Sequence, residues 1–218
     1  GVGAPIDPQP PQLAVVLSVI VPCVAGLMVF AVAILLYADR SVAETEWIRG
    51  LAAEGFAILV APMGALLLRR VPGNPLGWIL SGLALGAGAV ELLPFIAIHG
   101  ELVNHDTYFW TVFSAWITAP LGIAFLGTMV VMVPLLFPGG QAWTPGWRRY
   151  KRFAIGFVMV GTIATGIGAL PLVGGTNQID HTGGLLTATS SAIGDLTGGV
   201  SFLGCLVLSF FSAGNLVG

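Results

Sequence analysis

The stretch LLLRRVPGNPLGWIL, residues 66–80, puts a sharp polar interruption between two long apolar runs. Pro72 and Pro75 lack a backbone N–H, and each disfavours a helical conformation at the residue before it. Asn74 accepts turn conformations, and the amphipathic ring of Trp78 suits the headgroup level of a membrane. The stretch therefore predicts a rigid turn between two helices, with an aromatic anchor on its far side.

Composition indicates what surrounds these helices. Hydrophobic residues make up 56% of the 218-residue chain and charged residues only 8%, whereas a soluble domain carries roughly a quarter charged residues. Because so few charges do not cover a water-facing surface, the sequence predicts an all-α integral membrane protein. A helical crossing needs about 20 apolar residues, and the expected crossings are residues 13–37, 51–68, 76–98, 109–137, 153–173 and 191–213.

The basic residues orient this predicted bundle of about six transmembrane helices. Apart from Arg40 and Arg49 they all lie in two interhelical stretches, as Arg69, Arg70, Arg148, Arg149, Lys151 and Arg152. Short cytoplasmic loops carry the Lys/Arg excess of membrane proteins, so both stretches are expected inside the cell. Both ends are then cytoplasmic, with residues 1–12 as a tail and residues 13–218 as the membrane domain. We also expect truncation at the C-terminus, since the sequence stops where the last helix would leave the bilayer.

The cytoplasmic stretches also offer contacts to lipid or to a partner protein. A basic residue near an anionic membrane surface gains about 1 kcal/mol. The expected contact residues are Arg69, Arg70, Asn74, Pro75, Trp78, Trp147, Arg148, Arg149, Lys151 and Arg152. The alternative is that these stretches are only tight, positively charged loops.

Three ionisable residues interrupt the apolar runs: Glu54, Glu91 and Asp195. Charged groups are costly within a bilayer and usually face the bundle interior. Together with His99, two turns beyond Glu91 and nearer water, they form a candidate intramembrane site for a proton, a cation or an amphipathic ligand. The alternative for Glu54 and Asp195 is a capping or hydrogen-bonding role near the helix ends.

Small residues on the same helical faces support this inward orientation. Ala57 and Ala61 follow Glu54 at helical spacing, and Gly88 precedes Glu91 by three residues. Such residues mark close helix–helix contact in membranes. Periodicity alone leaves open whether the carboxylates meet one another.

The connection HGELVNHD, residues 99–106, gathers possible zinc or transition-metal ligands, namely His99, Glu101, His105 and Asp106. Their spacing matches no standard zinc motif, so a solvated acidic loop is the stronger expectation. The sequence also lacks a phosphate-binding glycine loop, a zinc-protease helix and a nucleophile elbow. We therefore expect no catalytic residues, no cofactor, no resident metal and no nucleic-acid partner, but bound lipids.

A family resemblance rests on the two basic stretches. RRVPGNPLGW, residues 69–78, and LLFPGGQAWTPGWRR, residues 135–149, resemble loops in the multi-pass membrane region of bacterial sensor histidine kinases of the actinobacterial and chloroflexi type. Gly139 and Gln141 stand where that family usually has Asp and Arg. The resemblance implies a location in the bacterial plasma membrane and a cytoplasmic kinase module that this sequence does not contain.

These observations leave three functional hypotheses. The first is a non-catalytic, signal-sensing membrane domain of a two-component sensor-kinase-like protein. The second is a structural or accessory subunit of a larger membrane complex, or a homo-oligomer, which needs no active site. The third is a small transporter, for which Glu91 and the prolines within the apolar runs are suggestive. Substrate flux, stoichiometric partners or a downstream kinase module would distinguish the three.

Overall fold

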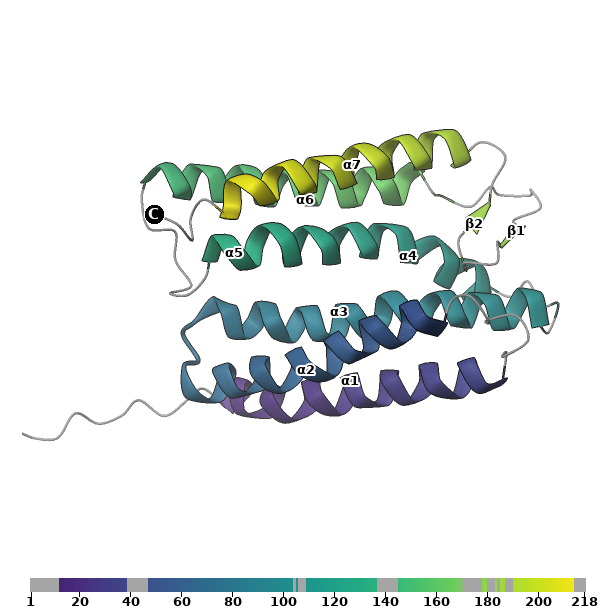
Figure 1. Ribbon diagram of the computed structural model, residues 1–218, viewed down its shortest axis with the longest axis horizontal. Helices are drawn as coiled ribbons and strands as arrows, with labels where there is room; N and C mark the ends of the chain where they lie inside the picture. The colour runs from purple at the N-terminus through teal and green to yellow at the C-terminus, as the bar shows by residue number, and fades with distance from the viewer. Residues whose placement is uncertain are drawn as a thin grey trace, which may run out of the picture.

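In the computed structural model, the described residues form six helical rods that run side by side (Figure 1). The structure describes residues 12–38, 47–103, 105, 109–136, 145–168, 170, 178–179, 183, 185–186 and 190–213. The rods are α1 (Gln12–Ala38), α2 (Trp47–Arg70), α3 (Pro75–Ile98) with its π-helical continuation η1 (His99–Val103), α4 (Phe109–Gly127) with η2 (Thr128–Met132) and α5 (Val133–Leu136), α6 (Pro145–Gly168), and α7 (Ser190–Ala213). A two-residue strand, β1 (Gln178–Ile179), pairs antiparallel with β2 (Leu185–Leu186).

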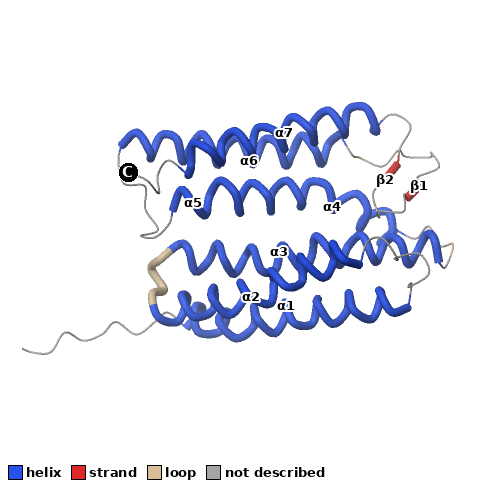
Figure 2. Tube along the Cα trace, in the orientation of Figure 1, coloured by secondary structure: helices blue, strands red, loops and turns tan. Residues whose placement is uncertain are grey.

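The rods pack as two groups of three. Helices α1, α2 and α3 contact one another, α6 packs on α4 and α7, and α3 packs against α4 to join the groups. Figure 1 shows the start of α1, the connection from α2 to α3, the start of α6 and the end of α7 at one end of the bundle. We call this end, which carries Arg69, Arg70 and Arg148–Arg152, the basic end. Figure 2 shows the α2–α3 connection there as a short loop.

The expectation of an all-helical bundle of six rods is confirmed within the described residues, apart from the short β1–β2 pair. Among the described residues, four segments are long and apolar enough to cross a membrane, namely Gln12–Ala38, Pro75–Glu101, Phe109–Leu136 and Gly146–Gly168; α2, an expected crossing, is not one of them. Helix α7 contributes a shorter apolar run, Gly198–Ser212. Segments of this length and composition are typical of a membrane protein.

The surface of α1 shows where lipid would lie. Its buried residues are mostly small and recur at helical spacing, as Ala14, Ser18, Val21, Ala25 and Val32. Its large apolar side chains point outward instead, and Leu27 and Phe30 are 66% and 64% exposed. Helices α6 and α7 expose similar side chains, such as Val160 and Phe210. An apolar surface of this extent is unfavourable in water and marks contact with a membrane or a partner.

Three threonine hydroxyl groups in the rods bond to the backbone of their own helix. Thr118, Thr128 and Thr162 each donate to the carbonyl four residues earlier, at 2.7–2.8 Å. This local bond satisfies the hydroxyl groups of these three residues without water, whereas the buried hydroxyls of Ser81, Thr111 and Thr165 have no hydrogen-bond partner among the described residues. It is therefore a second feature that suits these helices to an apolar surrounding.

The fifth rod differs from the sequence expectation. Helix α6 begins at Pro145 and ends at Gly168, where residues 153–173 were expected. The residues Arg148, Arg149, Lys151 and Arg152 therefore lie on its first turns and not in a loop. Proline is favoured at the first helical position, and long basic side chains can extend from a helix end toward water. The expected tail, residues 1–12, lies outside the described residues except for Gln12.

Candidate functional site

Glu54 lies in the first half of α2 and is only 4% exposed. Ala57 and Ala61, which share its helical face, are 0% and 2% exposed. The predicted inward orientation of this face is therefore confirmed. Small side chains here allow a neighbouring helix to come close to α2.

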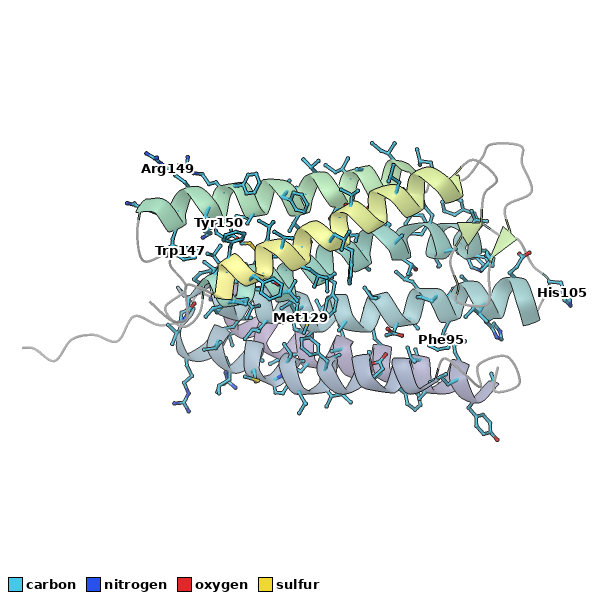
Figure 3. The ribbon with its side chains drawn as sticks, turned by 45° about the horizontal axis from the view of Figure 1, so that its top comes forward. Phe95, His105, Met129, Trp147, Arg149 and Tyr150 are labelled. Carbon is cyan, nitrogen blue, oxygen red and sulfur yellow. The ribbon has the colours of Figure 1, made fainter. Side chains whose placement is uncertain are left out.

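Glu91 lies in the second half of α3 and is buried, as are Ala84, Gly88 and Phe95 on the same face. A Cβ atom at Gly88 would lie 3.0 Å from the Sδ atom of Met28 in α1. The predicted inward face of α3 is thus confirmed, and it packs closely on α1. In Figure 3, Phe95 and His105 lie toward the end of the bundle opposite Trp147 and Arg149.

The α2–α3 hairpin brings the two carboxylates together. A Cβ atom at Gly64 would lie 2.7 Å from the backbone nitrogen of Ser81, and one at Gly77 would lie 3.1 Å from the backbone nitrogen of Leu68. Each of these pairs is placed symmetrically about the turn at residues 71–74, with equal numbers of residues on either side. Glu54 and Glu91 are symmetric about the same turn. They lie close enough for their charges to interact.

The surroundings of this carboxylate pair are apolar. One cluster, including Val60, Ala61 and Leu83, packs on the side toward the basic end. A second, including Phe95 and Ile98, packs on the other side. Both carboxylate oxygens of Glu54 are buried and have no hydrogen-bond partner among the described residues.

This arrangement dictates the chemistry available to the pair. An ionised carboxylate in an apolar interior is strongly disfavoured unless it is paired or hydrogen-bonded. Two carboxylates in one site also oppose each other's ionisation. The pair of Glu54 and Glu91 can therefore hold a proton or a small cation. Neither event needs a nucleophile or a cofactor.

The other candidate residues, at the end of the bundle opposite the basic end, are arranged differently. His99 ends α3 and begins η1, so it continues the rod that carries Glu91. His105 is exposed and has a left-handed backbone with φ of 57°. Among the described residues, no three His, Cys, Asp or Glu side chains form a group that could hold a metal, so His99, Glu101 and His105 do not assemble one. Asp106, the fourth expected ligand, lies outside the described residues.

Close packing at this end involves glycines. A Cβ atom at Gly100 would lie 2.5 Å from the Oγ1 atom of Thr111 in α4. One at Gly183, which has φ of +77°, would lie 2.6 Å from the backbone of Pro94. Ile179 of β1 packs with Ala97 and Ala115. The described part of the β1–β2 segment thus rests on α3 and α4, just beyond the carboxylate pair.

Asp195, the third predicted intramembrane carboxylate, is separate from this pair. It lies near the start of α7, in the other group of helices. Its side chain is outside the described residues. The structure therefore brings together two of the three predicted carboxylates.

At the basic end, the turn between α2 and α3 is built by the predicted residues. The side chain of Asn74 caps α3 by accepting a hydrogen bond from the backbone nitrogen of Leu76 at 2.9 Å, and Pro75 occupies the first helical position. The indole nitrogen of Trp78 donates to the carbonyl of Pro72 at 3.4 Å. These contacts fix the shape of the turn. The shape of the turn then determines which residues of α2 and α3 lie opposite each other.

Sequence reasoning missed two features of the functional regions. It did not pair Glu54 with Glu91, although the symmetry of the turn was available as a signal. It also passed over Tyr150, whose hydroxyl donates to the carbonyl of Leu208 at 2.6 Å and so ties α6 to α7. A tyrosine within a basic cluster gave no sequence signal for that contact.

Comparison with known proteins adds no relatives. No protein-family model matches the chain, and it has no match among curated proteins or solved structures.

Proposed function

We propose that this chain is the signal-sensing membrane region of a bacterial sensor-kinase-like protein, and that protonation of the Glu54–Glu91 pair is its stimulus. The observation that carries the proposal is the burial of Glu54 beside Glu91, with both Glu54 oxygens lacking a hydrogen-bond partner within the described residues. Ionisable groups buried in membrane helices cost free energy and usually have a function. The resemblance of residues 69–78 and 135–149 to sensor-kinase loops supports the same assignment.

A change in protonation would act on the packing of α2 against α3. Two unit charges 4 Å apart repel by about 4 kcal/mol at an effective dielectric constant of 20. Shifting a two-state equilibrium from mostly one state to mostly the other takes about 5.5 kcal/mol. At such a separation, ionisation of both carboxylates would be an effect of the size needed to separate the two helices.

The hairpin provides the route for this change. Helices α2 and α3 meet at the basic end through the turn fixed by Asn74, Pro75 and Trp78. In the proposed orientation the basic end and both ends of the chain face the cytoplasm of a bacterial cell. A shift of α2 against α3 would then reach the side on which a kinase module acts.

The decisive experiment measures helix separation as a function of pH. Spin labels placed at Met63 on α2 and Gly82 on α3, both exposed, report the distance between these helices in lipid nanodiscs. We expect a pH-dependent change in wild type that is lost in Glu54→Gln, because glutamine is the neutral isostere and does not titrate. Glu101→Gln, at a partly exposed position on η1, serves as the control and should keep the change. A Glu54→Gln protein that responds like wild type would refute the proposal.

A small transporter is the second candidate. Pro62 and Pro94 lie inside the helices that carry the carboxylates, and interrupted helices are common at transporter sites. Proteoliposomes with a pH gradient separate the two functions. Proton or cation flux that requires Glu54 favours transport, while a distance change without flux favours sensing. A stoichiometric partner that copurifies in either case would favour an accessory subunit.

A further inference from the structure

The first turns of α6 are fixed on their inner side. The Tyr150 hydroxyl donates to the carbonyl of Leu208 in α7 at 2.6 Å. The Trp147 ring stands edge-on to the Tyr150 ring with centroids 5.5 Å apart. Both rings pack on a buried cluster that includes Leu135 and Leu136. The rotation of α6 about its axis is therefore set at this end.

This anchoring turns four basic side chains toward the outside. Arg148, Arg149 and Arg152 are exposed and Lys151 is half-buried. Together they line an open hollow on the surface of the basic end. Figure 3 shows Arg149 pointing away from the bundle, on the side opposite Tyr150.

The placement of these cations is electrostatically unfavourable for the protein alone. They occupy the N-terminal turns of α6, where the helix dipole favours negative groups and opposes positive ones. Arg148 and Arg152 are spaced i, i+4, and Arg149 and Arg152 are spaced i, i+3, so their charges repel. The carboxylates whose side chains the structure describes, Glu54, Glu91 and Glu101, lie on α2, α3 and η1 away from this end. The described part of the chain thus offers the hollow no counter-charge.

The basic residues at the end of α2 make an informative contrast. Arg69 and Arg70 lie in the last turn of that helix, where the dipole favours cations. Their position is explained without a ligand. The cations of α6 face the opposite dipole sign and have no counter-charge within the described ranges, so the two basic groups are not equivalent.

The apolar surface below the hollow indicates what supplies the missing charge. Phe153, one residue beyond the basic cluster, is 61% exposed, and Met159, Val160 and Ile163 continue an exposed apolar surface along α6. The hollow therefore lies at the upper edge of a lipid-compatible face. We propose that it binds the phosphate of an anionic lipid headgroup, which neutralises the cations while the acyl chains lie along α6. This proposal holds whether or not the carboxylate pair senses protons.

Retention of lipid by the purified protein tests the site. Wild type, Arg148→Gln/Arg149→Gln/Arg152→Gln and the control Arg69→Gln/Arg70→Gln are reconstituted with mixed phosphatidylglycerol and phosphatidylcholine, washed in detergent, and analysed for bound lipid by mass spectrometry. Each basic residue near an anionic surface is worth roughly five-fold in affinity. We therefore expect the triple variant to lose phosphatidylglycerol enrichment by about 100-fold. Arg69 and Arg70 do not line the hollow, so the α2 control should keep the lipid that survives the wash. The single variant Arg149→Gln should show a loss of roughly five-fold.

Thermal unfolding gives a second readout that does not depend on lipid retention. Phosphatidylglycerol should raise the melting temperature of wild type and of the α2 control, but not that of the triple variant. Equal enrichment in the triple variant and wild type would overturn the proposal. So would binding of inorganic phosphate at the same residues with no preference for phosphatidylglycerol over phosphatidylcholine, since the ligand would then be a soluble anion. If the triple variant does not fold, the single variant decides by the same criteria.

Discussion

Substitution of Gly64 by alanine tests the hairpin geometry on which the carboxylate pair depends. A Cβ atom at Gly64 would lie 2.7 Å from both the backbone nitrogen and the Oγ atom of Ser81, and 3.1 Å from the carbonyl carbon of Leu80. The optimum for carbon contacts is about 3.5–4.0 Å. Because two of these three atoms belong to the backbone, α3 as a whole has to move away from α2.

The expected cost follows from this displacement. Overpacking a well-packed contact costs about 1–3 kcal/mol, while alanine gains up to about 1 kcal/mol over glycine in helix propensity. Gly82→Ala on α3 isolates the second term, because a Cβ atom there has nothing within 4 Å. We therefore expect Gly64→Ala to be less stable than Gly82→Ala by about 1–3 kcal/mol.

Thermal unfolding in one detergent, followed by circular dichroism, measures this difference. For a chain of this size it corresponds to a lower melting temperature by roughly 2–4 °C per kcal/mol. If Gly64→Ala melts at the temperature of Gly82→Ala, then α2 and α3 are not in close contact at this position. The register that brings Glu54 to Glu91 would then lose its main support.

Two further substitutions test contacts at the basic end by the same unfolding measurement. Asn74→Ala should lower stability by about 1 kcal/mol because it removes the cap of α3, whereas Gly73→Ala in the same turn should have little effect, since a Cβ atom there meets nothing within 4 Å. Tyr150→Phe should cost about 0.5–1.5 kcal/mol by removing the hydrogen bond to Leu208, and Tyr150→Leu should cost more because the ring contact with Trp147 is lost as well. An Asn74→Ala protein as stable as Gly73→Ala, or equal stability of the two Tyr150 variants, would contradict these assignments.

The helical bundle was predictable because each rod is a long apolar run bounded by polar residues or prolines. Helix α1 spans Gln12–Ala38 where residues 13–37 were expected, and α7 spans Ser190–Ala213 where residues 191–213 were expected. The fifth rod begins earlier than expected because basic residues, which are typical of a loop between membrane helices, occupy its first turns. The sequence shows where an apolar run gives way to charged residues, but this is not always the helix boundary. A helix also continues through charged residues whose long side chains reach water.

Other features depend on contacts that the sequence does not display. The π-helix η2 precedes Pro134 within the fourth rod, and such an irregularity arises from local packing as well as from the proline. The contact of Gly183 with Pro94 joins residues far apart in the sequence. The possible metal ligands at residues 99–106 were identified from residue types alone, and among the described residues His99, Glu101 and His105 do not form a group that could hold a metal.

The carboxylate pair shows how a short turn can determine a contact between residues far apart in the sequence. A short turn of fixed shape forces two antiparallel helices to pair residues that are equidistant from it, and the proline, asparagine cap and tryptophan around residues 71–74 fix that shape. Glu54 and Glu91 fall on such a symmetric pair, and the alanines and glycines beside them allow the helices to approach. The meeting of the two carboxylates therefore follows from the turn and from the small residues together. Neither feature alone is sufficient, since the turn sets the register and the small residues set the distance.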